Sequence, residues 1–340
     1  MSVDKYDIGL VTVEEEIHQL AKKKLENGES FLLYSLPNNE AHLAGLHDEA
    51  AIFPLRKWDD LSSLDFNDLP NEAKSVKDFP KETNYRDYSV WFKSFQQAFS
   101  NSRLRKAILS TVLIESRPQS FDAIEFFERL RTTYPKAFVY LINHPTEGLW
   151  CGATPELLLE KKGNRYQTVA LAGSQPLKDD QNYSWKGKEI HEQETVSEHI
   201  RDILSGLQIK NLEESEPYSI EAGKVVHLKT DFTFDFEGDP IKLADKLHPT
   251  PAIAGLPVKD SMELINEVER HDRGLYTGYL GISTEDYTAL FVNLRCMRIG
   301  DSELALYVGG GITSESKLED EWNETRLKAQ TLLNLINRSN

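Results

Sequence analysis

The sequence predicts an α+β fold, a single large domain in which extended, mostly antiparallel β-sheets are packed between helices. Strand-like segments follow one another with connections of hairpin length, most clearly at residues 156–173, where two runs flank a Lys-Gly-Asn turn. Helical segments separate these clusters of strands, whereas a doubly wound fold would alternate single strands with single helices. The chain of 340 residues is long enough to bury an extended core within one domain, residues 1–340.

The first half of the chain contains both types of element. Apolar residues at helical spacing predict a helix over residues 13–28, and a buried strand follows at residues 31–37. Residues 57–88, rich in Asp, Asn, Ser, Lys and Pro, predict a long loop. The periodicity then predicts a helix at 90–99, a strand at 106–114, a helix at 121–134 and a strand at 137–144.

The second half begins with the predicted hairpin at residues 156–173. A helix should cover residues 188–207, because an apolar stripe recurs at helical spacing and Gly206 lies near its end. Three strand-like runs with short connections follow at 275–283, 286–299 and 303–312, and the last helix begins at about Leu318.

The balance of charge limits the class of ligand. The chain has 55 acidic and 39 basic residues, which give a formal net charge of −16. Nucleic acids and anionic membranes require clustered Lys and Arg, so neither is an expected partner. An anionic small molecule would have to be bound by positive charge gathered locally.

The sequence also indicates the cellular compartment of the protein and the state of its two cysteines. The N-terminus lacks a basic segment followed by an apolar one, and no apolar run is long enough to span a bilayer, which indicates a cytoplasmic protein. Cys151 and Cys296 both lie in apolar, strand-like sequence, where a buried free thiol is the usual state. Neither a disulfide framework nor a thiolate metal site is expected.

Two predicted helices carry carboxylates at helical spacing. Glu321, Glu324 and Lys328 are three and four residues apart, so they share one helical face. Glu189 and Glu192 are three apart, on the side of the apolar stripe of their helix. Carboxylates from two helices suit Mg²⁺, which also takes waters and oxygens of an anionic substrate. From spacing alone, a solvated acidic face or a favourable charge in the first helical turn explains each pair better.

A glycine run and an arginine are further candidate ligand-binding features. Gly309, Gly310 and Gly311 end a strand-like run, where the backbone can approach a ligand and direct N–H groups at a carboxylate or phosphate. The run lacks the spacing of a P-loop or of a dinucleotide-binding motif, and a tight strand end is the simpler interpretation. Arg295 lies inside an otherwise apolar predicted strand, so it must either face solvent or hold an anion.

The order of these motifs resembles that of the chorismate-utilising enzymes. This family includes isochorismate synthase, salicylate synthase and the large subunits of anthranilate and aminodeoxychorismate synthases. The motifs that carry the resemblance are TPELLLEKKGNRYQTVALAGS, KEIHEQE, VVHLKTDF, LHPTPAIAGLP, HDRGLYTGYLG, LFVNLRCMRI, YVGGGI and EDEWNETRLKAQTLL. The resemblance covers residues 104–340, the implied catalytic core, whereas residues 1–100 form a divergent N-terminal part. It implies the α+β fold of anthranilate synthase component I.

The resemblance implies a cofactor, Mg²⁺, and its ligands. In such enzymes the second glutamate of each acidic motif coordinates the ion, which here means Glu192 and Glu324. Glu189 and Glu321 would then lie close to the ion or to its waters. The metal would bind one carboxylate of chorismate.

The resemblance also implies a substrate site. The second carboxylate of chorismate should be held by Arg295, Tyr276, Lys328 and the backbone of Gly309 and Gly311. His227 occupies the position of a histidine near the ring. Gly173 and Ala252 complete the expected substrate-binding set.

The nucleophile distinguishes the members of the family. Lys106, in RKAILSTVL, resembles the lysine that activates water for attack at ring carbon C2, although Thr111 replaces the arginine of that motif. An unpaired lysine in an enclosed site can act as a base because burial disfavours its charge. Amine transfer is disfavoured, because Ala172 stands where aminodeoxychorismate synthases carry a nucleophilic lysine, and no glutaminase subunit is expected. Glu156 matches the general acid that protonates the departing C4 hydroxyl.

The resemblance thus implies an enzyme that isomerises chorismate to isochorismate, for menaquinone or siderophore biosynthesis. It also implies that this enzyme is a monomer. Salicylate synthase, which then eliminates pyruvate, is the alternative, although Ala252 and Ile253 look closer to the isochorismate synthases. A different class is a non-catalytic, acidic metal-binding interaction protein, which would make the set Lys106, Glu156, Glu192 and Glu324 coincidental.

Overall fold

The computed structural model describes most of the chain. The described residues are 11–12, 29–34, 51–53, 77–101, 104–144, 147–178, 183–222, 225–284 and 287–336. The helix predicted at residues 13–28 and most of the loop predicted at 57–88 lie outside them.

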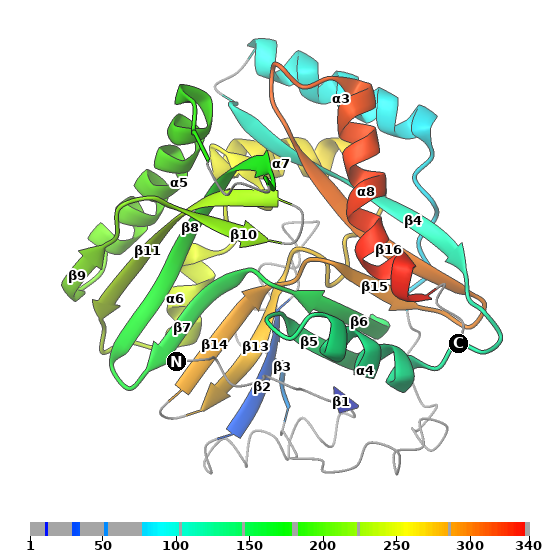
Figure 1. The fold of residues 1–340 in the computed structure, drawn as a ribbon, viewed down its shortest axis with the longest axis horizontal. Coiled ribbons are helices and arrows are strands. Elements are labelled where there is room, and N and C mark those ends of the chain that lie inside the picture. Colours follow the sequence, from blue (N-terminus) through cyan, green and yellow to red (C-terminus); the bar gives the residue numbers. More distant parts are fainter. Residues whose placement is uncertain are drawn as a thin grey trace.

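Seven strands form one sheet (Figure 1). Their order is β1 (Val11–Thr12), β5 (Phe138–His144), β6 (Gly148–Thr154), β15 (Cys296–Ile299), β16 (Glu303–Ile312), β4 (Lys106–Ser116) and β12 (Gly255–Leu256). Among the described pairings of this sheet, only the short one of β1 with β5 is parallel. The long pairing of β4 with β16 sets Gly309 opposite Ser110 and Gly311 opposite Ile108.

Nine strands form the second sheet, in which the described pairs are all antiparallel. The order is β10 (Tyr218–Ala222), β11 (Val225–Asp235), β8 (Arg165–Pro176), β7 (Leu157–Lys162), β14 (Tyr287–Val292), β13 (Tyr279–Thr284), β2 (Glu29–Tyr34) and β3 (Ala51–Phe53), and β9 (Lys210–Glu214) pairs with β11. The predicted hairpin is confirmed, because Gly163 takes a positive φ of 57° between β7 and β8. The α+β fold with mostly antiparallel sheets is therefore confirmed.

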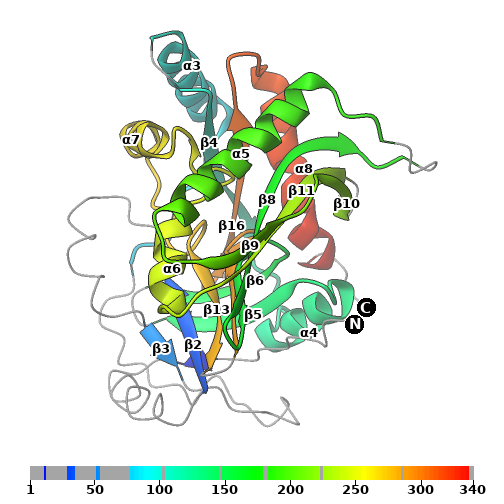
Figure 2. The same ribbon diagram turned by 90° about the vertical axis from the view of Figure 1, so that its left-hand side faces the viewer.

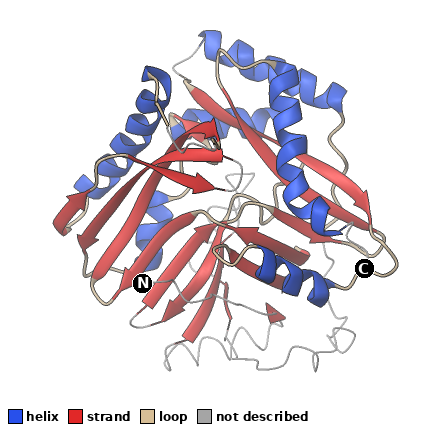
Figure 3. Ribbon diagram, viewed as in Figure 1, coloured by secondary structure: helices blue, strands red, loops and turns tan. Residues whose placement is uncertain are grey.

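The helices lie mainly on the outside of the two sheets (Figure 3). They are α3 (Tyr85–Asn101), α4 (Ala123–Thr133), α5 (Gly187–Ser205), α6 (Pro240–Leu247), α7 (Val258–Val268) and α8 (Leu318–Ile336). Helix α5 lies across β8 and β11, as Figure 2 shows, and α8 packs along β16. None of the described helices is long and apolar enough to cross a membrane.

Three features of the helices differ from the prediction: α3 begins earlier, and neither α6 nor α7 was predicted. Residues 85–88, assigned to the long loop, belong to α3, because Tyr88 is fully buried and packs with Phe92 and Phe95. Helix α6 was not predicted, although Asp239 accepts a hydrogen bond from the backbone N–H of Ile241 and a proline occupies the first turn. That pattern is a recognisable N-terminal signal.

The strand predicted at residues 286–299 is wrong as a single element. It breaks into β14 and β15, which belong to different sheets. Buried Asn293 interrupts it by donating a side-chain hydrogen bond to the carbonyl of Leu275 (2.7 Å) and accepting one from Tyr140 (2.7 Å). Arg295 follows with a φ of 48°, which no strand residue adopts. Arg295 thus lies in the connection between the sheets and not inside a strand.

The connection at Asn293 passes beside a core shared by both sheets. Phe138 of β5 stacks on Phe291 of β14 with ring centroids 4.9 Å apart, and Trp150 of β6 stacks on Tyr307 of β16 at 5.0 Å. Cys151 and Cys296 are buried free thiols, as predicted. The two sheets therefore form one packed unit in which the ends of their strands are fixed relative to each other.

Helix α8 offers a matched test of this packing. Leu332 is 3% exposed in a core cluster, whereas Leu327 on the same helix is 66% exposed. Leu332→Ala should lower the free energy of unfolding by roughly 2–5 kcal/mol, because it leaves a cavity. Leu327→Ala should change it by less than about 0.5 kcal/mol. Urea unfolding followed by circular dichroism measures both, and similar losses would contradict this packing of α8.

Candidate active site

The glycine run of β16 lies at the centre of the candidate site. A Cβ atom on Gly311 would stand 2.5 Å from Cε of Lys106, and one on Gly309 would stand 2.8 Å from the hydroxyl of Tyr276. A side chain at either position would therefore displace the end of Lys106 or the hydroxyl of Tyr276. The simpler interpretation of a tight strand end does not explain why two predicted site residues occupy this space.

Lys106 is the first residue of β4 and is held by its surroundings. Its carbonyl accepts a hydrogen bond from the hydroxyl of Ser261 (2.9 Å). Its Nζ atom forms an ion pair with Oε1 of Glu192 at 2.5 Å, and both side chains are mostly buried. The expectation of an unpaired lysine is therefore wrong, because α5 brings a carboxylate to it. Lys106 must leave Glu192 and lose a proton before its neutral amine can act as a base.

The acidic residues of α8 approach β16 beside Gly310. A Cβ atom on Gly310 would lie 3.3 Å from Oε2 of Glu321 and 3.9 Å from Oε1 of Glu324. Burial raises the pKa of Glu321, and the charge of Glu324 adds to this rise, while a hydrogen bond from Ser316 opposes it. The two carboxylates are thus close enough to repel each other.

Lys328 connects α8 to the edge of β16. Its Nζ atom forms an ion pair with Oε1 of Glu324 at 2.7 Å and donates a hydrogen bond to the carbonyl of Gly309 at 2.9 Å. Strand β15 pairs with β16 only as far as Tyr307, so this carbonyl is accessible to the helix. A Cβ on Gly310 would point to Glu321 and Glu324 and one on Gly311 to Lys106, so these groups flank the glycine run on its two sides.

The four predicted metal ligands are only partly brought together. Glu192 and Glu324 each hold a lysine, and among the described residues no group of three or more His, Cys, Asp and Glu is arranged around one point. Glu189 accepts a hydrogen bond from the backbone N–H of Lys186 (3.2 Å) and packs against Gly173. Its geometry is that of a carboxylate in the first helical turn.

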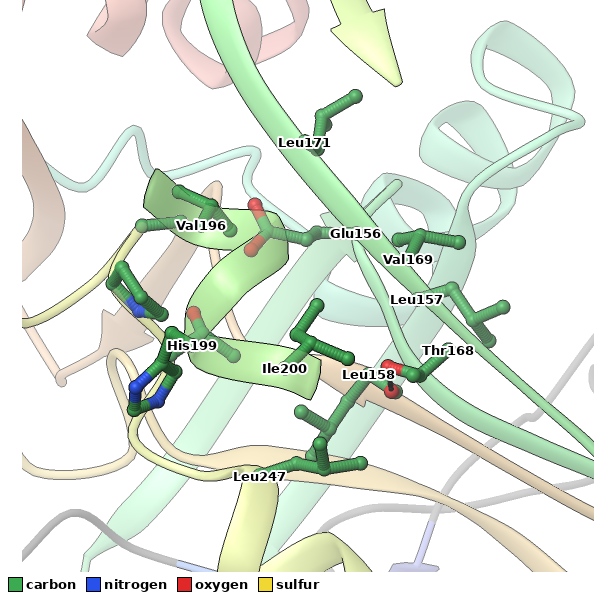
Figure 4. A pocket seen from close by; sticks show the side chains of 13 residues that line it. Glu156, Leu157, Leu158, Thr168, Val169, Leu171, Val196, His199, Ile200 and Leu247 are labelled. Atoms are coloured by element: carbon green, nitrogen blue, oxygen red, sulfur yellow. Dashed lines mark hydrogen bonds between the residues drawn. The ribbon is translucent and has the colours of Figure 1, made fainter. Parts of the chain in front are cut away.

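Glu156 lies between β6 and β7 and lines a pocket whose lining also includes Ala252. Figure 4 shows its carboxyl group directed toward α5. Burial raises the pKa of Glu156 to about 7, although the charges of Lys106, Arg295 and Lys328 oppose the rise. A carboxyl group that is close to half protonated at neutral pH can donate a proton to a leaving group.

His227 and Gly173 occupy an irregularity between β8 and β11. The pairing shifts between His227 and Leu228, and Gly173 takes a φ of 72° at this point. The carbonyl of Gly173 lies 3.2 Å from Nδ1 of His227. Burial lowers the pKa of His227, and the cations Arg295, Lys328 and Lys106 lower it further. His227 is therefore a neutral hydrogen-bonding group at pH 7.

Arg295 and Tyr276 complete the predicted set. Arg295 is half-buried, and burial lowers its pKa, but a guanidinium stays charged at neutral pH. Tyr276 is 3% exposed, and burial raises the pKa of its hydroxyl, which stays protonated beside Gly309. Three cations, Arg295, Lys106 and Lys328, thus surround Glu156 in a protein with a strongly negative net charge.

Thr111 does not face this group of residues. Ser110 precedes it on β4 and points to the side of Lys106 and Ile108, so Thr111 points to the other face. Its hydroxyl is fully buried and has no hydrogen-bond partner among the described residues. A threonine at this position therefore leaves the Lys106 side of the strand unaltered.

A buried ion pair that contacts β4 was not predicted from the sequence. Glu269 accepts hydrogen bonds from the backbone (2.7 Å) and hydroxyl (2.9 Å) of Ser110 and from Arg273 (2.8 and 2.9 Å). Arg273 also donates to the carbonyls of Ile108 (2.9 Å) and Ile253 (3.2 Å). Charged residues four apart at the end of an apolar helix were the available signal. The pair holds β4 against the segment that contains Ala252.

Comparison with known proteins gives a family model and several relatives that match the chain. The family model described as "Chorismate binding enzyme" matches residues 24–337. The isochorismate synthase EntC of Escherichia coli is 30% identical over 242 residues, which is 68% of this chain and 62% of EntC. The chain thus spans less than two thirds of that relative.

Two solved structures share the fold. The 2,3-dihydroxybenzoate-specific isochorismate synthase DhbC from Bacillus anthracis superposes with a TM-score of 0.73 at 24% identity, covering 96% of this chain and 89% of DhbC. The menaquinone-specific isochorismate synthase MenF from Escherichia coli gives a TM-score of 0.67 at 21% identity, over 78% of this chain and 65% of MenF.

Glu156 gives a pH-dependent prediction. Its pKa rises from 4.5 to about 7 on folding, so the native state binds the proton more tightly and stability falls as the pH rises through this range. Glu156→Gln does not titrate, so its free energy of unfolding should increase relative to the parent between about pH 4.5 and 7, and the difference should then level off. Urea unfolding at a series of pH values measures this difference. A constant difference would contradict a raised pKa.

Proposed function

The chain belongs to the chorismate-binding enzyme family, and on this premise we propose that it is an isochorismate synthase. The observation that carries the proposal is the placement of Lys106 and Glu156, a candidate base and a candidate acid, within electrostatic reach of each other. The names of its relatives agree with this activity. A protein that only binds chorismate would not need both groups.

The reaction requires one proton to be removed and one to be supplied. Water adds to ring carbon C2, the double bonds migrate, and the C4 hydroxyl departs as water. Lys106 would take the proton from the attacking water, and Glu156 would give its proton to the departing hydroxyl. The raised pKa of Glu156, about 7, keeps a large protonated fraction at neutral pH, as this role requires.

The cationic groups would bind the carboxylates of chorismate. Arg295 and Lys328 supply the charge, and the backbone of Gly309 and Gly311 can approach closely because no Cβ intervenes. The protonated hydroxyl of Tyr276 is a donor beside Gly309. His227, Gly173 and Ala252 would line the ring. This positive charge lets a negatively charged protein hold a dianion.

Mg²⁺ is the proposed cofactor, with Glu192 and Glu324 as ligands and Glu189 and Glu321 near the ion or its waters. Carboxylates are the ligands that Mg²⁺ prefers, and the repulsion between Glu321 and Glu324 is a condition that a cation relieves. When bound, the ion would polarise and orient a substrate carboxylate. If a bound ion drew Glu192 and Glu324 away from Lys106 and Lys328, the two lysines would become available to water and substrate.

The proposed context follows from this chemistry. Because water and not ammonia is the nucleophile, the enzyme would need no glutaminase subunit and could act as a cytoplasmic monomer. Isochorismate would enter menaquinone or siderophore biosynthesis, and the two structural relatives carry names from each route.

The direct test is to incubate the protein with chorismate and Mg²⁺, or with EDTA, and to separate the products by chromatography. We expect isochorismate with Mg²⁺ and none with EDTA. Salicylate with pyruvate would instead assign the chain to the salicylate synthases. Unchanged chorismate would contradict the proposal and favour a non-catalytic metal-binding protein.

The metal assignment has a separate test on α8. Glu324→Gln should weaken Mg²⁺ binding, measured by titration calorimetry in the presence of chorismate, by about tenfold or more, because a charged ligand is lost. Turnover should fall with it. Asp320→Asn removes an exposed carboxylate one turn earlier and should change neither quantity. Equal effects of both substitutions would mean that Glu324 acts only through its charge and is not a ligand of the ion.

A further inference from the structure

The backbone at Thr277 is held in an unfavourable conformation. Thr277 lies between α7 and β13 and takes a φ of 65°. This left-handed region is strongly disfavoured for a β-branched residue. A turn that only reversed the chain could use glycine here, as it does three residues earlier, where Gly274 has a φ of 53°. Strain of this kind persists only where the surrounding structure enforces it, and it concentrates at functional sites.

Four hydrogen bonds enforce this conformation. The backbone N–H of Thr277 donates to the carbonyl of Asn293 (2.8 Å), and its carbonyl accepts from Nε2 of His248 (2.8 Å). Its hydroxyl donates to the carbonyl of Tyr276 (2.6 Å) and accepts from Nη1 of Arg273 (3.4 Å). Thr277 is fully buried, so water cannot replace these partners if the backbone turns.

His248 is the donor that holds the carbonyl of Thr277. A carbonyl oxygen only accepts hydrogen bonds, so Nε2 of His248 must carry the proton. Burial lowers the pKa of His248 to about 4, which keeps the imidazole neutral at pH 7. Its ring lies edge-on to that of Tyr279, with centroids 5.3 Å apart. His248 is therefore a fixed, uncharged donor at the end of α6.

The conformation of Thr277 determines where the side chain of Tyr276 points. The ring of Tyr276 stacks on Tyr307 with centroids 5.8 Å apart. Its hydroxyl lies beside Gly309, where a Cβ atom would be only 2.8 Å away. Because the ring is confined by this stacking, the position of the hydroxyl follows that of the backbone at residues 276–277. A change of φ at Thr277 would move the hydroxyl away from Gly309.

We propose that Thr277 is a positioning residue whose left-handed backbone directs the hydroxyl of Tyr276 to a substrate carboxylate beside Gly309, and that His248 holds it in this conformation. The inference rests on the proposed function, because the carboxylate is one of those of chorismate. Thr277 and His248 act through Tyr276 and not on the substrate itself. A donor fixed in advance binds more tightly, because it loses no freedom when the substrate arrives.

Thr277→Gly tests the role of this backbone. Glycine adopts a φ of 65° without strain, so the variant should fold, but it no longer confines the turn and lacks the hydroxyl. With Mg²⁺, the KM for chorismate should rise about tenfold, because the donor to a charged group is no longer fixed. The kcat should stay within about twofold of the parent value, because a carboxylate is bound equally in the ground and transition states.

Asn211→Gly is the matched control. Asn211 also takes a positive φ, 50°, but it lies on the exposed strand β9. This substitution should change neither KM nor kcat. A tenfold rise of KM in this variant too would overturn the assignment to Thr277, because relief of backbone strain anywhere in the chain would then suffice.

A double-mutant cycle separates positioning from a general effect on the fold. Tyr276→Phe alone should raise KM, and adding Thr277→Gly should raise it no further, because the hydroxyl to be positioned is absent. Effects on KM that multiply in the double variant would overturn the proposal, as would an unchanged KM in Thr277→Gly. A fall in kcat at unchanged KM would also overturn it, because it would report only a loss of folded protein.

Two substitutions test His248. His248→Leu removes the donor and should raise KM as Thr277→Gly does, whereas His248→Gln retains an N–H donor and should keep the parent KM. An equal rise in both variants would overturn the role of His248.

A parent protein that consumes no chorismate would overturn the proposed function and not the positioning. The same ratios should then appear in the Kd of chorismate, measured by titration calorimetry. Equal Kd values for the parent and Thr277→Gly would overturn the positioning as well.

Discussion

The antiparallel pairing of β16 with β4 is the constraint on which the rest of the site depends. Its register places Gly311 opposite Ile108 and so leaves room for the side chain of Lys106, which starts β4. A shift by one residue would exchange the faces of the strand and turn Gly309 and Gly311 away from Lys106 and Tyr276. The importance of Gly309 and Gly311 lies less in their flexibility than in the space that their lack of a side chain leaves for Lys106 and Tyr276.

This pairing is held in place by buried polar contacts that do not belong to the proposed catalytic residues. Glu269 accepts a hydrogen bond from the backbone N–H of Ser110, and Arg273 donates one to the carbonyl of Ile108. Asn293 donates one to the carbonyl of Leu275 and so fixes the point where the chain passes from one sheet to the other. A buried charged pair contributes little net stability, but removing one partner leaves the other charge uncompensated. These residues are therefore better understood as fixing geometry than as adding stability.

Much of the fold could be predicted from the sequence, and the predicted site residues Lys106, Tyr276 and Lys328 lie together around the glycine run of β16. Helical periodicity located α5 and α8, and the turn residues located the β7–β8 hairpin, because local preferences and tertiary packing agree there. The break at Asn293 could not be predicted, since it depends on a hydrogen bond from Tyr140, which is distant in sequence. The pairing of Lys106 with Glu192 was missed for the same reason, because it joins residues 86 positions apart.

The ion pairs found at Lys106 and Lys328 support the entry of a divalent cation together with the substrate. Apart from Glu156, the site contains the cations Lys106, Lys328 and Arg295 and the carboxylates of Glu189, Glu192, Glu321 and Glu324, so it is close to neutral before anything binds. A dianion added alone would have to compete with Glu192 and Glu324 for the same lysines, which in a partly buried site is costly. A divalent cation would remove that competition, because it could take the two glutamates as ligands while the lysines turned to the new carboxylates. On this physical argument, substrate and metal should favour each other's binding, with Glu192 and Glu324 as the residues that exchange partners.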